Sequence, residues 1–202
     1  MPTGGSKMLN PKATIALMIC CRLGTFELQA QSMPIQNRVE SLIDSWEGRP
    51  TARESLLKVG SEPEVLKALG AIAASSRQPF MRRHHAIGVL ATFKSDQSVG
   101  LLARVAESAE ALYRCDAIQA LAEIATKSTV PVLVGKLDDH SVCMQFQFSD
   151  PASTADVYVS DEAVRALESV TGQTFGQKSS DSHRVTNPWK SWWAKQQRER
   201  VE

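Results

Sequence analysis

Residues 82–137 read RRHHAIGVLATFKSDQSVGLLARVAESAEALYRCDAIQALAEIATKSTVPVLVGKL, and one pattern occurs twice within them. Ala86–Ala91 (AIGVLA) aligns with Ala117–Ala122 (AIQALA), an offset of 31 in the numbering. The same offset applied once more towards the N-terminus reaches Ser55–Gly60. The recurrence indicates an internal repeat of helix pairs, which predicts the architecture but leaves the activity open.

Each repeat contains two short segments whose apolar residues recur every three or four positions, as on one face of an amphipathic helix. Those residues are Leu56, Val59, Leu66, Leu69, Ile72, Ala73, Ala86, Ile87, Leu90, Phe93, Val99, Leu102, Val105, Ala106, Ala117, Ile118, Leu121, Ile124, Val130, Leu133 and Leu137. Ser61–Glu64 reads as a capping box around Pro63, and Ser128 or Thr129 is placed to cap a helix with Pro131 in its first turn. Helices this short need neighbours to cover their apolar faces, so we expect an all-α solenoid of stacked pairs.

A longer pattern surrounds the aligned segments: Arg-x-x-Ala/Ser-aliphatic-x-x-Leu/Val-Gly/Ala, beginning at Arg83 and Arg114, followed by a polar turn and a second helix. It resembles the HEAT-like repeats, and most of all the bacterial branch that includes the phycobilisome-lyase type. The resemblance covers roughly Thr51 to Gly172 and implies a solenoid of about four helix pairs. It implies little about function, because the motif residues are packing residues.

The sequence divides into four parts. They are a leader (1–31), an N-terminal cap helix (32–50), HEAT-like repeats (51–172, with an insert at 138–161) and a C-terminal loop with a tryptophan-rich cap helix (173–202). In the second part, Pro34–Trp46 is amphipathic and Gly48–Pro50 ends it. Its apolar stripe consists of Ile35, Val39, Leu42, Ile43 and Trp46. We expect this helix to cover the first repeat, with a partner-binding helix as the alternative.

A short insert separates the third and fourth units, because Glu162–Leu167 aligns with the third unit at an offset of 46 instead of 31. Its apolar residues alternate with other residues, at Met144, Phe146, Phe148, Val157 and Val159. A period of two predicts two extended segments, forming a small hairpin around the polar turn Ser149–Asp156. Phe146 and Phe148 then either pack over the core as a flap or form an interaction surface.

The C-terminal part begins where Gly172 can end a helix in the left-handed conformation. Asn187 and Pro188 then start a last helix, on which Trp189, Trp192 and Trp193 share one face. The sequence Thr-Gly-Gln-x-Phe-Gly before this helix resembles the end of secreted bacterial HEAT-like proteins of unknown role, although the loop is longer here. The tryptophans either form a buried end cap or an interaction surface for a sugar or an aromatic ligand.

Composition and charge exclude some partners. The 202 residues carry a formal net charge of +1, which gives no global field that would attract nucleic acid or anionic lipid. No segment resembles a membrane span of about 20 apolar residues. We therefore expect a protein partner, no nucleic acid and no integral membrane segment.

The leader has the layout of a secretory signal peptide, because Lys7 and Lys12 precede the apolar run Ala13–Cys21. Export to the periplasm or the extracellular space is thus expected. Arg22 interrupts the pattern, so the alternative is an unstructured or weakly helical leader on a cytoplasmic protein. A lipoprotein anchor is not favoured, because Ile19 stands before Cys20 where a small residue is needed.

The sequence contains no phosphate-binding loop, serine nucleophile elbow or Cys-x-x-Cys pair, so we assign no catalytic residue and no cofactor. Helix topology could gather five side chains with metal-binding chemistry at one edge. They are His84, His85, Cys115, His140 and Cys143. The alternative is that these histidines are exposed at helix starts and the cysteines are incidental. For an exported chain, Cys115 and Cys143 either form a disulfide or remain two free thiols.

The leading functional interpretation is a non-catalytic protein-interaction or scaffold module that uses the concave face formed by the second helices. The alternative is a bilin-lyase-like enzyme or enzyme accessory, which follows from fold analogy alone.

Overall fold

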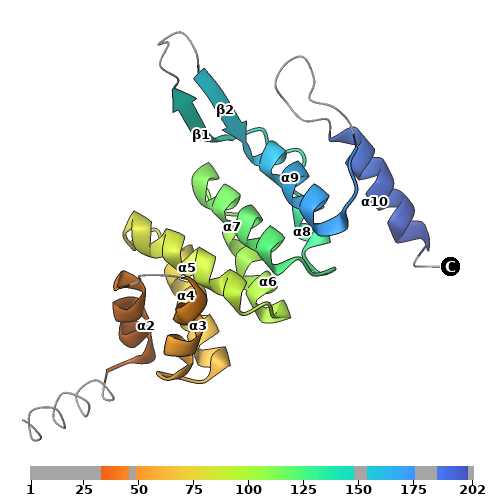
Figure 1. The fold of residues 1–202 in the computed structure, drawn as a ribbon. Helices are drawn as coiled ribbons and strands as arrows, with labels where there is room; N and C mark the ends of the chain where they lie inside the picture. The colour runs from red at the N-terminus through yellow and green to blue at the C-terminus, as the bar shows by residue number, and fades with distance from the viewer. Residues whose placement is uncertain (1–32, 46–48, 148–153, 176–185, 200–202) are drawn as a thin grey trace, which may run out of the picture.

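The computed structural model describes residues 33–45, 49–147, 154–175 and 186–199 (Figure 1). In chain order the elements are α2 (Ile35–Asp44), α3 (Arg49–Leu57), α4 (Glu62–Ala74), α5 (Phe80–Thr92), α6 (Asp96–Val105), α7 (Ala111–Ile124), α8 (Val130–Val134), β1 (Val142–Gln147), β2 (Thr154–Tyr158), α9 (Val159–Thr171) and α10 (Asn187–Glu199). These ranges are mostly helical, with one two-stranded sheet, and the predicted all-α class is confirmed. The predicted signal peptide and Trp46 lie outside them.

Most of the helices form two rows (Figure 1). In the first row, α5, α7 and α9 lie side by side, and each contacts the next. In the second row, α4 contacts α6, while α8 packs on α9. The second helices of the two aligned repeats make equivalent contacts, because α6 packs on α7 and α8 packs on α9.

The core confirms the apolar stripe that defines the repeat. Leu90 on α5 and Leu121 on α7 are both fully buried, as are Ile87 and Ile118 one turn earlier. Equivalent positions of the two aligned repeats are thus buried in the core to the same extent. A single hydrophobic core runs from Val39 on α2 to Trp189 on α10.

The repeat arginines have equivalent contacts. Arg83 donates to the carbonyl of Ala73 at 3.2 Å and to the carboxylate of Glu110 at 2.7 Å. Arg114 donates to the carbonyl of Ser108 at 2.8 Å, and its Nε lies 2.8 Å from Asp139 Oδ2. Each arginine therefore binds a carbonyl before its own helix and a carboxylate in the turn that follows its helix pair. This arrangement ties each helix pair to its neighbour.

Two helix ends agree with the local sequence signals. At the start of α4 the Ser61 N–H donates to the Glu64 carboxylate at 3.0 Å, and the capping box is complete. Hydrogen bonds from the side chain and then the backbone of Ser61 lower the pKa of Glu64. At the end of α9, Gly172 adopts φ +68°, a left-handed conformation that favours glycine.

Two helices are shorter than expected. In the first unit, α3 ends at Leu57, so Val59 lies in the following turn and is only half-buried. In the third unit α8 ends at Val134, although Leu137 beyond it is still fully buried. The hydroxyl of Thr129 donates to the Thr126 carbonyl at 2.7 Å instead of capping α8.

The predicted hairpin in the insert is present, but β2 begins at Thr154, so the prediction that the turn extends to Asp156 is wrong. β1 and β2 pair antiparallel, with Phe146 opposite Ala155. The flap interpretation is wrong for Phe146, which is 51 % exposed because only a small residue faces it across the strands. Phe148 lies outside the described residues. Val159 is not in a strand but is the fully buried first residue of α9.

The described ranges hold no helix with the length and apolar character that crossing a membrane requires.

The close approach of α4 and α6 generates a testable contrast between two glycines. A Cβ on Gly70 would lie 2.4 Å from Leu101 Cδ2, whereas a Cβ on Gly100 would meet no heavy atom within 4 Å. We expect Gly100→Ala to raise the free energy of unfolding by about 0.5–1 kcal/mol, the usual gain of alanine over glycine in a helix. Gly70→Ala should lose this gain because Leu101 has to move. Urea unfolding measures both, and an equal gain in the two variants would show that the helices do not touch at Gly70.

Candidate functional site

A groove of about 820 Å³ runs between α4 and α6 in the second row of helices. It is lined by Pro63, Lys67, Gly70, Ala71, Ala74, Gln97, Gly100, Leu101 and Arg104. On each helix these residues recur every three or four positions, on the side away from the first row. Most of the lining residues therefore lie outside the core, although Gly70 is buried and Leu101 belongs to the core.

Small side chains give the groove its depth. Ala71, Ala74 and Gly100 are exposed, and the space above Gly100 is open. At Gly70 the lack of a side chain lets Leu101 pack against the backbone of α4. A partner could thus bring its own backbone close to both helices.

Two cations give the groove its charge. Lys67 on α4 and Arg104 on α6 line it, and the side chain of neither forms an ion pair or a hydrogen bond with another described residue. By contrast, Lys136, which follows α8, is paired with Glu107 at 2.6 Å. The groove therefore combines apolar walls with two cations that are not neutralised within the described part of the chain.

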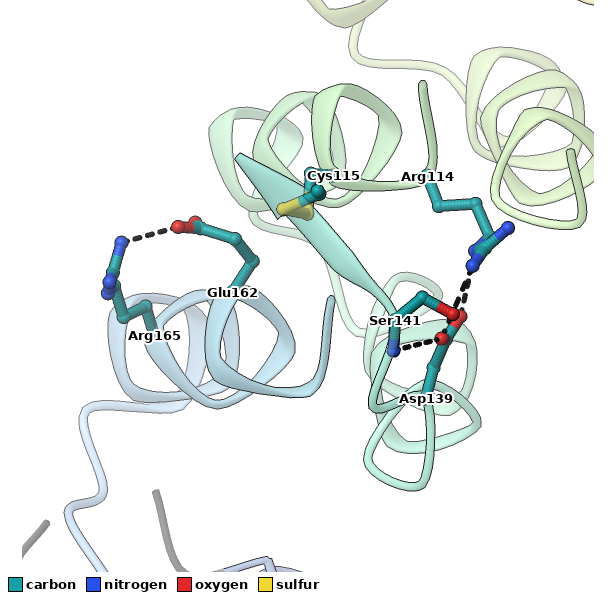
Figure 2. Close-up of a disulfide and its surroundings, with 7 residues drawn as sticks. Arg114, Cys115, Asp139, Ser141, Glu162 and Arg165 are labelled. Atoms are coloured by element: carbon teal, nitrogen blue, oxygen red, sulfur yellow. Dashed lines mark hydrogen bonds and ion pairs between the residues drawn. A yellow bond between two sulfur atoms is a disulfide. The ribbon is translucent and has the colours of Figure 1, made fainter. Parts of the chain in front are cut away.

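The disulfide edge is the second candidate region, at the N-terminal end of α7. Cys115 of α7 and Cys143 of β1 form a disulfide with a Cα–Cα distance of 6.3 Å (Figure 2). Cys115 is fully buried and Cys143 is 9 % exposed. The bond fastens the first strand of the hairpin to the first row of helices.

The three histidines among the metal candidates do not join the cysteines in one cluster. His84 Nδ1 lies 2.9 Å from Asp116 Oδ2, and its ring centroid is 6.0 Å from that of His85. His140 Nδ1 lies 3.5 Å from Ser160 Oγ. Both cysteine sulfurs are bonded to each other and offer no thiolate to a metal. Within the described ranges, no three His, Cys, Asp or Glu side chains are grouped so that they could hold a metal ion.

An ion pair stands beside the disulfide (Figure 2). The Asp139 carboxylate faces Arg114 and accepts from the Ser141 N–H at 3.1 Å. Burial raises the pKa of Asp139, but hydrogen bonds from the side chain and backbone of Ser141 and from Arg114 outweigh it, so the net pKa is lowered. The cluster fixes the chain that leads from α8 into β1.

The tryptophans of α10 behave as packing residues. Trp189 is fully buried and packs edge-on against Phe175, with ring centroids 4.8 Å apart. The interpretation of Trp189 as part of an interaction surface is therefore wrong, because its side chain is not exposed to solvent. Trp192 and Trp193 are half-buried against the same core. Of the aromatic surface candidates in the described ranges, Phe146 is the one that is mostly exposed.

Sequence reasoning missed the groove residues. Lys67, Gly100 and Arg104 fall outside the apolar stripes and belong to no motif, so they had no signal of their own. The sequence indicated the location of the groove only in general terms, through the expectation that the second helices form the binding face. Phe80 and Met81 at the start of α5, 48 % and 53 % exposed, were also not singled out.

Charged groups with lowered pKa values do not gather in the groove. Hydrogen bonds from Arg82 lower the pKa of Asp44, and Ser61 does the same for the pKa of Glu64. These carboxylates and Asp139 lie at separate places, and none lines the groove. Their shifts reflect ion pairs and caps that hold the fold together.

Comparison of the chain with protein-family models, with curated proteins and with solved structures gave no match in any of the three.

The lowered pKa of Asp139 predicts a pH-dependent contribution to stability. A carboxyl whose folded pKa is depressed stabilises the fold above its unfolded pKa of about 3.9 and loses this effect as the pH falls through the folded value. We expect Asp139→Asn to lower the free energy of unfolding at pH 7, with a smaller difference from the wild type at pH 3. Urea unfolding at both pH values measures this.

Glu54 provides the control for this prediction. It is exposed on α3 and forms no ion pair with a described residue. Glu54→Gln should change stability little at either pH. If Asp139→Asn lowers the free energy of unfolding by the same amount at pH 7 and at pH 3, the ionised carboxylate does not stabilise the fold.

Proposed function

We propose that this chain is a non-catalytic protein-interaction or scaffold module, a HEAT-like α-solenoid of about four helix pairs closed by α2 and α10. The repeated positions of Leu90 and Leu121 and the equivalent contacts of Arg83 and Arg114 support the solenoid. The second-helix face binds the partner. The groove between α4 and α6 is the observation that carries this proposal.

The chemistry of the groove suggests what kind of partner it accepts. Lys67 and Arg104 are exposed cations that find no carboxylate among the described residues, while the walls between them are small and apolar. Electrostatic complementarity favours a segment that places carboxylates beside a small apolar face. An amphipathic acidic helix meets both requirements, because its backbone can approach Gly100 closely.

Charge reversal in the groove tests the proposal. We expect Lys67→Glu with Arg104→Glu to abolish capture of the partner, which immobilised wild-type protein retains from an extract of the producing cells. Mass spectrometry identifies the retained proteins. The matched control is Lys58→Glu with Arg77→Glu, which makes the same charge change at two exposed turn residues outside the groove. If the groove variant retains the same proteins as the control, the groove is not the binding site.

We also propose that the chain is exported. The leader at residues 1–31 has the layout of a signal peptide, and the Cys115–Cys143 disulfide adds independent support because disulfides persist in oxidising compartments. Removal of the leader would also remove Cys20 and Cys21. The mature chain would then contain one disulfide and no free thiol.

Thiol counting checks this proposal. Mature protein purified from the oxidising compartment, denatured without reduction, should show no titratable thiol. Reduction should lower the free energy of unfolding by roughly 3–4 kcal/mol, since the bond joins residues with a sequence separation of 28. Two titratable thiols in the mature chain would contradict the pairing, and recovery of uncleaved protein from the cytoplasm would contradict export.

A further inference from the structure

The outer edge of β1 carries unpaired backbone groups. β1 pairs with β2 on one side. Outside that ladder, no described residue forms a hydrogen bond with the backbone of residues 142–147. In an antiparallel strand about half of the N–H and C=O groups point to each side, so the outer edge of β1 is an open template for another strand.

The position of the hairpin leaves this edge accessible. The hairpin projects beyond the N-terminal ends of α7 and α9, with β2 on the side of α9 and β1 on the other side (Figure 1). The disulfide to Cys115 holds the base of β1 in place. Beyond that base, Gln145, Phe146 and Gln147 are all exposed. The edge is therefore presented by an anchored strand and not by a free loop.

The composition of β1 lacks the features that usually protect an edge. Natural edge strands are commonly blocked by lysine, by proline or by an inward charge. Residues 142–147 read VCMQFQ and contain no charged residue and no proline. β2 differs, because Asp156 lies in its middle. Of the two strands, β1 is the one that another strand can approach without meeting a charge.

An apolar face leads from the core to the exposed end of β1. Met144 pairs with Val157, which is 8 % exposed and belongs to the core. Two residues further along, on the same face, Phe146 pairs with Ala155. Ala155 is too small to cover the phenyl ring, which is 51 % exposed. A third strand beside β1 could cover the other side of that ring.

We propose that β1 pairs antiparallel with β1 of a second copy of this chain, about a twofold axis at Phe146. The register places Phe146 opposite Phe146 of the partner subunit, and Gln145 opposite Gln147 of the partner subunit. Both pairs are self-complementary, because aromatic rings pair with each other across strands and a glutamine amide both donates and accepts hydrogen bonds. The Gln145 amide nitrogen donates to Asp156 of its own hairpin at 2.8 Å, so its carbonyl oxygen is the group that accepts from Gln147 of the partner subunit. The two hairpins then form one four-stranded sheet.

The second copy is favoured over an unrelated strand by this symmetry and by the absence of charge on β1. An isologous pair joins the same surface on both subunits, so it needs a strand that does not repel itself. Only three exposed residues per strand take part, which predicts a weak, concentration-dependent dimer. The pairing does not depend on the groove between α4 and α6, which lies on the second row of helices.

Sedimentation equilibrium of the full chain over a wide concentration range tests the proposal. We expect the average mass of the wild type to rise towards twice that of the monomer. Phe146→Lys should remain monomeric at every concentration, because it places like charges opposite each other at the axis. Met81→Lys is the matched control, since Met81 is 53 % exposed on α5 and far from the hairpin in sequence, and it should dimerise like the wild type. Far-ultraviolet circular dichroism verifies that both variants are folded.

Hydrogen exchange locates the contact. Among the amides of Gln145, Phe146 and Gln147, those that point to the outer edge of β1 should become more protected as the wild-type concentration rises, while those that face β2 should change little. A wild type that stays monomeric, or a dimer that Phe146→Lys leaves intact, would overturn the proposal. Protection of these amides only when a different protein is added would also overturn it, and would assign the edge to strand addition by that protein.

Discussion

Burial of short apolar helix faces against neighbouring helices is the interaction on which the rest of this structure depends. The longest described helix, α7, has 14 residues, and helices of this length are marginal alone in water. Stacking of α5, α7 and α9 covers Leu90 and Leu121 completely. Arg83 and Arg114 then fix each pair against the next turn, so the same two kinds of contact recur along the chain.

The hairpin departs from this scheme and needs another means of attachment. A two-stranded hairpin is marginal by itself, and β1 and β2 of this one project beyond the N-terminal ends of α7 and α9. The disulfide from Cys143 to α7 attaches the hairpin covalently. Asp139, Arg114 and Ser141 fix the chain just before β1. Near the helices the insert also packs on the core through Met144 and Val157, whereas Phe146 further along β1 is exposed and available for another contact.

The two proposed surfaces use different features of the fold. The groove between α4 and α6 arises because the outward faces of these helices carry small residues and two cations that no described carboxylate neutralises. The edge of β1 arises because a hairpin has no strand beyond it. Since the groove lies on the second row and the hairpin at the N-terminal ends of the first row, one chain could bind a partner while it pairs with a second copy. Such a dimer would present two grooves.

The sequence by itself determined what depends on local periodicity: the helices of the two aligned repeats, the capping box at Ser61, the left-handed Gly172 and the alternating insert. It could not decide whether Cys115 and Cys143 pair, because the path of the insert depends on contacts between residues far apart in the chain. It also could not show that Trp189 is fully buried or that Lys67 and Arg104 share a groove. Burial and proximity on neighbouring helices are properties of the assembled rows, and only the tertiary structure brings these residues together.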